Sequence, residues 1–168
     1  MACAHSGAMS EKPILNVGEF YAHALAIEHE AVRRYREFEA YFAGRGDDVL
    51  AGLCRNLADM EGEHLRALTR ATESMRLPSI DASRHDWLAP GSSSAAHEAF
   101  YRVVEARQLL EIALRSECDA MGFFEWVAHT TADPGVRALA TEMAGEEMDH
   151  VKWVRNAIEY ARAGDRRA

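Results

Sequence analysis

Two copies of a Glu-x-x-His motif are the residues in this chain that most clearly could do chemistry. The first copy is Glu61 and His64, and the second is Glu147 and His150. On an α-helix, residues three apart lie on one face about one turn from each other. Carboxylates and imidazoles are common ligands of iron, manganese and zinc. One such pair is weak evidence, because Glu-x-x-His is frequent on exposed helices, but two pairs indicate a metal site.

A lone glutamate lies upstream of each motif, so the same pattern occurs once in each half of the chain. Glu28 ends an Ala-Leu-x-x-Glu segment at residues 24–28, and Glu117 ends a matching segment at residues 113–117. The distance from lone glutamate to motif is similar in both halves, 33 residues in the first and 30 in the second. The repeating unit is therefore expected to be a helical hairpin.

Helical periodicity, capping residues and breakers predict four helices and no strands. Asn16, Asp47 and Asp133 are suitable N-caps, and Pro134 suits the first position of the last helix. Gly44-Arg45-Gly46 breaks the chain between the first two helices. The predicted helices cover about residues 16–44, 47–74, 97–131 and 133–163.

Two short turns and one long connection give this all-α chain the topology of a four-helix bundle. Two antiparallel hairpins would be joined by a crossover connector at about residues 75–96, which Trp87 would pin to the side of the bundle. Residues 1–15 are expected to be a flexible tail, and residues 16–164 the bundle. Each lone glutamate and its motif lie roughly 22–25 Å from their turn along the helix axes. All of these side chains can therefore meet in one layer.

Each predicted helix carries an apolar stripe, and the candidate ligands interrupt these stripes. An ionised carboxylate in an apolar interior costs several kcal/mol unless it is compensated. No lysine or arginine lies on the stripes, so a cation from outside, such as a divalent metal ion, is expected. Alanines flank the lone glutamates on their stripes and either leave space for ions or allow close helix packing. The proposed ligands are Glu28, Glu61, His64, Glu117, Glu147 and His150.

Composition excludes several other classes of protein. The formal net charge of −8 argues against nucleic-acid binding and against adsorption to an anionic membrane. No apolar run is long enough to cross a bilayer, and the first 13 residues lack the apolar core of a secretory signal. Cys3, Cys54 and Cys118 form no Cys-x-x-Cys pair, which argues against a disulfide framework and favours a cytoplasmic protein. Cys54 and Cys118 are interpreted as small buried hydrophobes. The remaining histidines are interpreted as surface residues: His5, His23, His29, His85, His97 and His129.

The order Glu, Glu-x-x-His, Glu, Glu-x-x-His over four helices resembles the ferritin-like di-iron carboxylate superfamily. The Ala-Leu-x-x-Glu repeat most resembles its rubrerythrin-like branch, over about residues 16–163. This resemblance implies two iron ions per chain, with manganese or zinc as alternatives. The motif glutamates would bridge the metals, the lone glutamates would be terminal ligands, and each histidine would bind one metal.

The chain departs from that family at several positions. Rubrerythrins have a further glutamate where this chain has Ala120, and they carry a four-cysteine iron centre that this chain lacks. An external electron donor would therefore be required. Gly62 replaces the haem-binding methionine of bacterioferritin, and little chain follows the fourth helix. A ferritin storage cage is thus less expected than a homodimer.

The resemblance implies an oxidoreductase of rubrerythrin or ferroxidase type, which would reduce hydrogen peroxide or dioxygen in oxidative-stress defence or iron handling. Its catalytic residues would be the four glutamates together with Tyr35. Tyr35 lies seven residues after Glu28, where it could hydrogen-bond a ligand carboxylate, lie on an electron path, or be an ordinary core tyrosine that has found a partner. Two alternatives remain, a non-catalytic iron-binding or iron-delivery protein and a metal-free interaction bundle.

Overall fold

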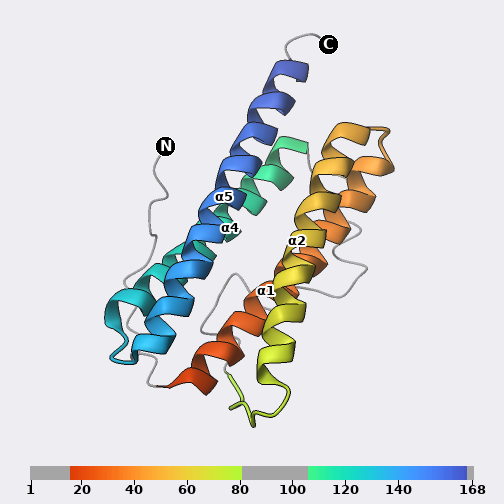
Figure 1. The fold of residues 1–168 in the computed structure, drawn as a ribbon. Coiled ribbons are helices and arrows are strands. Elements are labelled where there is room, and N and C mark those ends of the chain that lie inside the picture. Colours follow the sequence, from red (N-terminus) through yellow and green to blue (C-terminus); the bar gives the residue numbers. More distant parts are fainter. Residues whose placement is uncertain (1–15, 81–105, 166–168) are drawn as a thin grey trace.

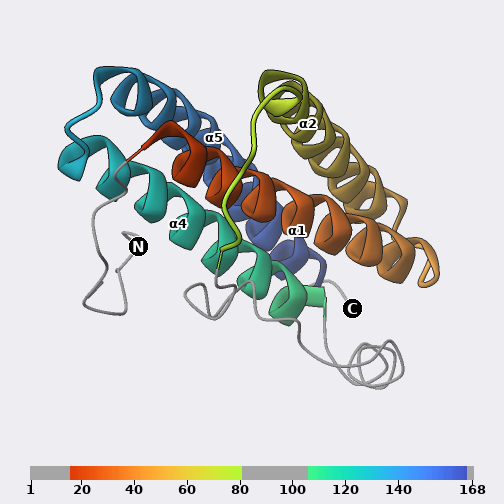
Figure 2. The same cartoon turned by 90° about the horizontal axis from the view of Figure 1, so that it is seen from below.

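Four α-helices make up the structure, a computed structural model that describes residues 16–80 and 106–165. They are α1 (Val17–Ala43), α2 (Asp48–Thr72), α4 (Ala106–Thr130) and α5 (Pro134–Asp165), and no strand occurs within those residues. Helices α1 and α2 form one antiparallel hairpin and α4 and α5 form another, and the two hairpins lie side by side (Figures 1 and 2). The predicted all-α four-helix bundle is confirmed.

The predicted capping residues define the helix starts. Asn16 Oδ1 accepts a hydrogen bond from the Glu19 backbone N–H at 3.0 Å, and Asp47 Oδ1 accepts one from Leu50 at the same distance. Asp133 Oδ1 accepts from the N–H groups of Gly135 and Val136. Each side chain satisfies a backbone donor that has no partner inside its helix.

The turn between α1 and α2 requires a glycine. Gly46 has φ 75°, in the left-handed region that glycine enters without steric cost. The predicted N-terminal tail, the connector with Trp87 and the predicted helix start at residue 97 lie outside the described residues. Helix α4 is described from Ala106 onward.

Two apolar clusters form the core, and a polar layer separates them along the bundle axis. The first cluster lies towards the α1–α2 turn and includes Tyr35, Phe42 and Leu57, with residues of α4 and α5 packed against them. The second lies towards the α4–α5 turn and includes Phe20 and Phe124. Both clusters draw residues from all four helices, so the hairpins are joined on both sides of the polar layer.

The two cysteines within the described residues differ. Cys54 is a fully buried free thiol, and burial raises its pKa to about 12, so its interpretation as a small buried hydrophobe is confirmed. Cys118 is only partly buried and takes part in a disulfide bond, so the same interpretation of Cys118 is wrong. The spacing of cysteines along a chain cannot show which of them the fold brings together.

Among the described helices, none combines the length and the apolar character that crossing a bilayer requires.

Candidate metal centre

The six predicted ligands meet in the polar layer between the two apolar clusters. Five of them are at least 95% buried: Glu28, Glu61, Glu117, Glu147 and His150. The sixth, His64, has a side chain that is 20% exposed. Helix α1 supplies one glutamate, α4 another, and α2 and α5 each supply a Glu-x-x-His pair.

His150 lies among the carboxylates of three helices. Its Nδ1 is 2.9 Å from Glu61 Oε1, 3.3 Å from Glu147 Oε2 and 3.6 Å from Glu117 Oε2. One ligand atom from each of these four residues falls within 4.8 Å of the others. We call Glu117, Glu147 and His150 the His150 half of the centre.

His64 lies among a second set of carboxylates. Its Nδ1 is 3.5 Å from Glu61 Oε2 and 3.8 Å from Glu28 Oε2. The rings of His64 and His150 stack with centroids 5.7 Å apart. We call Glu28 and His64 the His64 half, and Glu61 is shared because it lies close to both histidines.

Several buried polar atoms in this layer have no hydrogen-bond partner among the described residues. They are both carboxylate oxygens of Glu28, both of Glu61, and Nε2 of His150. Glu61 Oε1 instead lies 2.9 Å from His150 Nδ1, a distance that forms an ion pair when the imidazole is protonated. Leaving such groups buried and unpaired costs several kcal/mol. Oxygen and imidazole donors gathered in a buried layer fit one or more metal cations.

Without a metal, burial and the neighbouring charges shift the pKa values of several groups in the layer. Burial, with repulsion from Glu61, raises the pKa of Glu28 well above its usual range, and burial with repulsion from Glu117 does the same to Glu147. Burial opposes ionisation of Glu61, but its contacts with His150 and His64 outweigh this and lower its pKa to about 2. The contacts with Glu28 and Glu61 raise the pKa of His64 to about 10. Protons thus partly balance the negative charge of the layer.

Tyr35 donates a hydrogen bond from its hydroxyl to Oε1 of Glu117, one of the six candidate ligands. Burial, and then the charge of Glu117, raise the pKa of Tyr35, which therefore keeps its proton at neutral pH. In the repeat the position equivalent to Tyr35 is Phe124, seven residues after Glu117. Phenylalanine has no hydroxyl to donate.

Sequence reasoning missed one carboxylate near the centre. Glu146 Oε2 lies 3.7 Å from His64 Nε2, and the Glu146 side chain is 41% exposed. Its position next to Glu147 in the sequence could have suggested that it lies near the centre, but Glu146 lies off the apolar stripe.

The interpretation of His23 as a surface residue is wrong, because it is 6% exposed and its ring centroid lies 5.5 Å from that of Phe123. His29 and His129 are exposed as expected, and the other three lie outside the described residues.

No model of a known protein family matches this chain, and no curated protein matches its sequence. Among solved structures, the chain is similar to an uncharacterized conserved protein from Magnetospirillum magnetotacticum MS-1. The two share 27% sequence identity with a TM-score of 0.74, over 86% of this chain and 95% of that one. The similarity therefore covers most of both chains.

Proposed function

We propose that this chain is a di-iron carboxylate redox protein that reduces hydrogen peroxide or dioxygen, in oxidative-stress defence or iron handling. The observation that carries the proposal is the set of buried oxygens of Glu28 and Glu61 that have no hydrogen-bond partner among the described residues. A bundle that needed only stability would fill these positions with apolar side chains. The His150 half, the His64 half and the shared Glu61 would hold two ions.

The two ferrous ions, when bound, would supply the two electrons that convert hydrogen peroxide and two protons into two water molecules. The protein's own residues prepare the site for this reaction. Tyr35 orients the Glu117 carboxylate and holds a proton beside it. His64 is partly exposed whereas His150 is fully buried, so a small oxidant would reach the centre from the His64 side.

The test is to load metal-free protein with ferrous iron without oxygen, count iron per chain, and mix it with peroxide or dioxygen in stopped flow. We expect two ferrous ions to bind per chain, and we expect peroxide or dioxygen to oxidise both on the timescale of stopped flow. Glu61→Gln keeps the size of the shared carboxylate and removes its charge, so it should lose iron. Glu63→Gln is the matched control, because Glu63 is exposed two residues away on the same helix.

The outcomes separate the competing functions. Faster oxidation by peroxide supports a peroxidase, and faster oxidation by dioxygen supports a ferroxidase. Bound iron that reacts with neither supports an iron-binding or iron-delivery protein. Absence of stoichiometric iron, together with a Glu61→Leu variant that is more stable than the wild type, would establish the metal-free bundle instead.

A further inference from the structure

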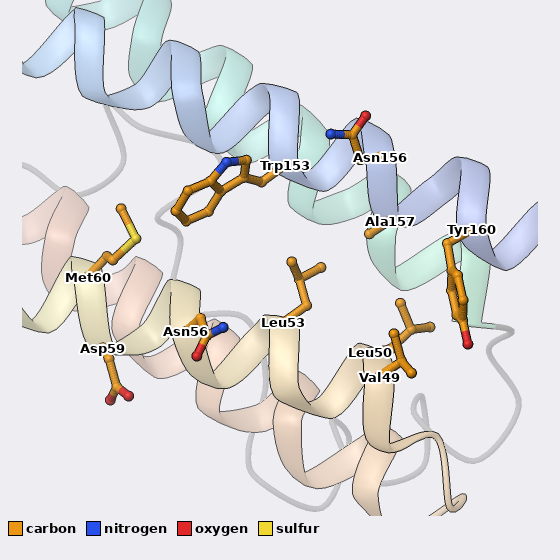
Figure 3. A pocket seen from close by; sticks show the side chains of 10 residues that line it. All are labelled: Val49, Leu50, Leu53, Asn56, Asp59, Met60, Trp153, Asn156, Ala157 and Tyr160. Atoms are coloured by element: carbon orange, nitrogen blue, oxygen red, sulfur yellow. The ribbon is translucent and has the colours of Figure 1, made fainter.

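An apolar pocket of about 660 Å³ lies between the first half of α2 and the last part of α5, outside the metal centre (Figure 3). Its volume is within the range of small-molecule sites. The residues that matter here are Val49, Leu53 and Met60 on α2, and Trp153, Ala157 and Tyr160 on α5.

Exposed apolar side chains gather at this pocket. Val49 is 57% exposed, Trp153 38% and Tyr160 50%, and these are half of the large exposed hydrophobic residues in the described part of the chain. Such clustering marks a binding surface, because soluble proteins rarely expose contiguous apolar patches without a function. The indole of Trp153 and the phenol of Tyr160 both project from α5 towards α2, at separate ends of the pocket (Figure 3).

The pocket is uncharged except for one carboxylate at its edge. None of the ten lining residues is lysine or arginine. Asp59 contributes a carboxylate, which is paired with Arg36 at 2.5 Å. The chain as a whole carries a net charge of −8. No lining residue therefore offers a phosphate-bearing cofactor a counter-charge, and the net charge of the chain opposes its binding, whereas an uncharged aromatic molecule needs no counter-charge.

Trp153 is also a neighbour of the metal centre. Its ring centroid lies 6.3 Å from that of His150, which is fully buried among the carboxylates. On the α2 side, Met60 directly precedes the shared Glu61. One wall of the pocket is thus a single aromatic residue away from the proposed irons.

We propose that this pocket binds an uncharged aromatic electron carrier of the hydroquinone–quinone class, with Trp153 as the wall between the carrier and His150. Electron transfer from this carrier rests on the proposed di-iron function, whereas its binding does not. A bound hydroquinone loses two electrons and two protons as it becomes the quinone. The electrons reduce two ferric ions to ferrous ions, and the protons leave through the open side of the pocket. The carrier would thus return the two ions to the ferrous state after each oxidation.

Binding is tested first in metal-free full-length protein, by calorimetry with tetramethyl-1,4-benzoquinone. Its fully substituted ring cannot add cysteine thiols, so only reversible binding is measured. Tyr160→Ala removes one aromatic wall and should weaken binding roughly tenfold, and Leu53→Trp should fill the pocket. Ile112→Ala is the matched control, because Ile112 is 40% exposed on α4 and does not line the pocket. Tyr160→Ala keeps the test decisive if Leu53→Trp fails to fold, since Tyr160 is half exposed.

Fluorescence locates the bound quinone. Binding should quench tryptophan emission in the wild type, and Trp153→Phe should lose this quenching while it still binds the quinone. Flavin mononucleotide, an anionic aromatic carrier, should bind at least roughly tenfold more weakly than the quinone. Tighter binding of the flavin, or quenching that survives in Trp153→Phe, would overturn the proposal.

Electron transfer is tested separately in protein loaded with ferric iron. Tetramethylhydroquinone should produce ferrous iron without oxygen, detected with a ferrous chelator, in the wild type and less in Leu53→Trp. Dithionite should reduce both proteins equally. A protein that holds two irons but binds no quinone refutes this inference alone, whereas quinone binding without iron refutes the proposed function alone. A dimer that Tyr160→Arg dissociates, with no quinone bound, would assign the pocket to a second copy of the chain.

Discussion

The two halves of the candidate centre carry the same ligand types but lie in different surroundings. In the His150 half, the histidine is fully buried, and Glu117 accepts a hydrogen bond from Tyr35. In the His64 half, the histidine is 20% exposed and faces Glu146, and neither oxygen of Glu28 has a hydrogen-bond partner among the described residues. The repeat in the sequence thus gives one sealed half and one half open towards solvent.

This difference teaches that duplicated ligands need not give equivalent sites. Residues that surround metal ligands fix their orientation and control access of solvent. Tyr35 orients the carboxylate of the sealed half, whereas the repeat places Phe124 at the corresponding position of the open half. We expect an ion in the His150 half to exchange slowly, and an ion in the His64 half to exchange faster.

The largest effect is expected from the residue that the halves share. Glu61→Gln should remove metal from both halves, because its carboxylate lies near both histidines. Iron should raise the Tm of the wild type but not that of Glu61→Gln. The stabilisation that the variant loses is about 2.7 kcal/mol per site when free iron is in hundredfold excess over Kd. Iron analysis and calorimetric melting measure this. If one ion per chain remained, Glu61 would belong to one half only.

The next largest effect should separate the two histidines. In metal-free protein His150→Ala should lower the free energy of unfolding by about 3 kcal/mol or more, because it leaves buried carboxylates without their cationic partner. His64→Ala should lower it by about 1 kcal/mol, since water can reach that side. Urea unfolding measures both. Equal losses would show that the open and sealed halves are energetically alike.

The pH dependence of iron binding should report on the open half. The pKa of His64 is raised to about 10 in the metal-free protein, so at neutral pH a proton occupies the nitrogen that would bind metal. Each pH unit between 6.5 and 9 should strengthen iron binding by about tenfold for each proton displaced. That proton stabilises the metal-free fold fully below about pH 6.5, and this contribution is lost as pH rises through 10.

The iron-induced rise in Tm should therefore grow with pH. Competition with a chelator at several pH values measures the affinity, and His64→Ala should flatten its slope. A slope that the variant leaves unchanged would place the displaced proton elsewhere in the layer.

An effect smaller than those of Glu61 and His150 is expected from the residue that differs between the repeats. Tyr35→Phe removes the hydrogen bond to Glu117 and should lower the free energy of unfolding by about 1.5–3 kcal/mol, the range for a bond to a charged group. Tyr160→Phe is the control, because its side chain is half exposed, and should change stability by less than about 0.5 kcal/mol. Faster iron exchange in the His150 half of Tyr35→Phe would link the bond to the sealing of that half.

The clustering of the candidate ligands could be predicted because they combine residue type with spacing on apolar stripes. A glutamate within an otherwise apolar stripe is informative, since burial makes it costly. The asymmetry could not be predicted in the same way. Glu146 reaches His64 from outside the stripe, and the burial of His23 depends on packing against Phe123 of another hairpin. The apolar pocket escaped prediction because its walls come from α2 and α5, whose relative placement no local pattern specifies.

The polar layer between the two apolar clusters also fixes how far one hairpin can slide along the other. Apolar stripes tolerate a shift of one turn, because one hydrophobic residue can replace another. Here such a shift would press Glu28 or Glu61 of the first hairpin against apolar residues of the second, such as Phe124 or Val154, and bury a carboxylate among hydrocarbon at a cost of several kcal/mol. The buried polar residues of the candidate metal centre therefore favour one register of the two hairpins, even before any ion is bound.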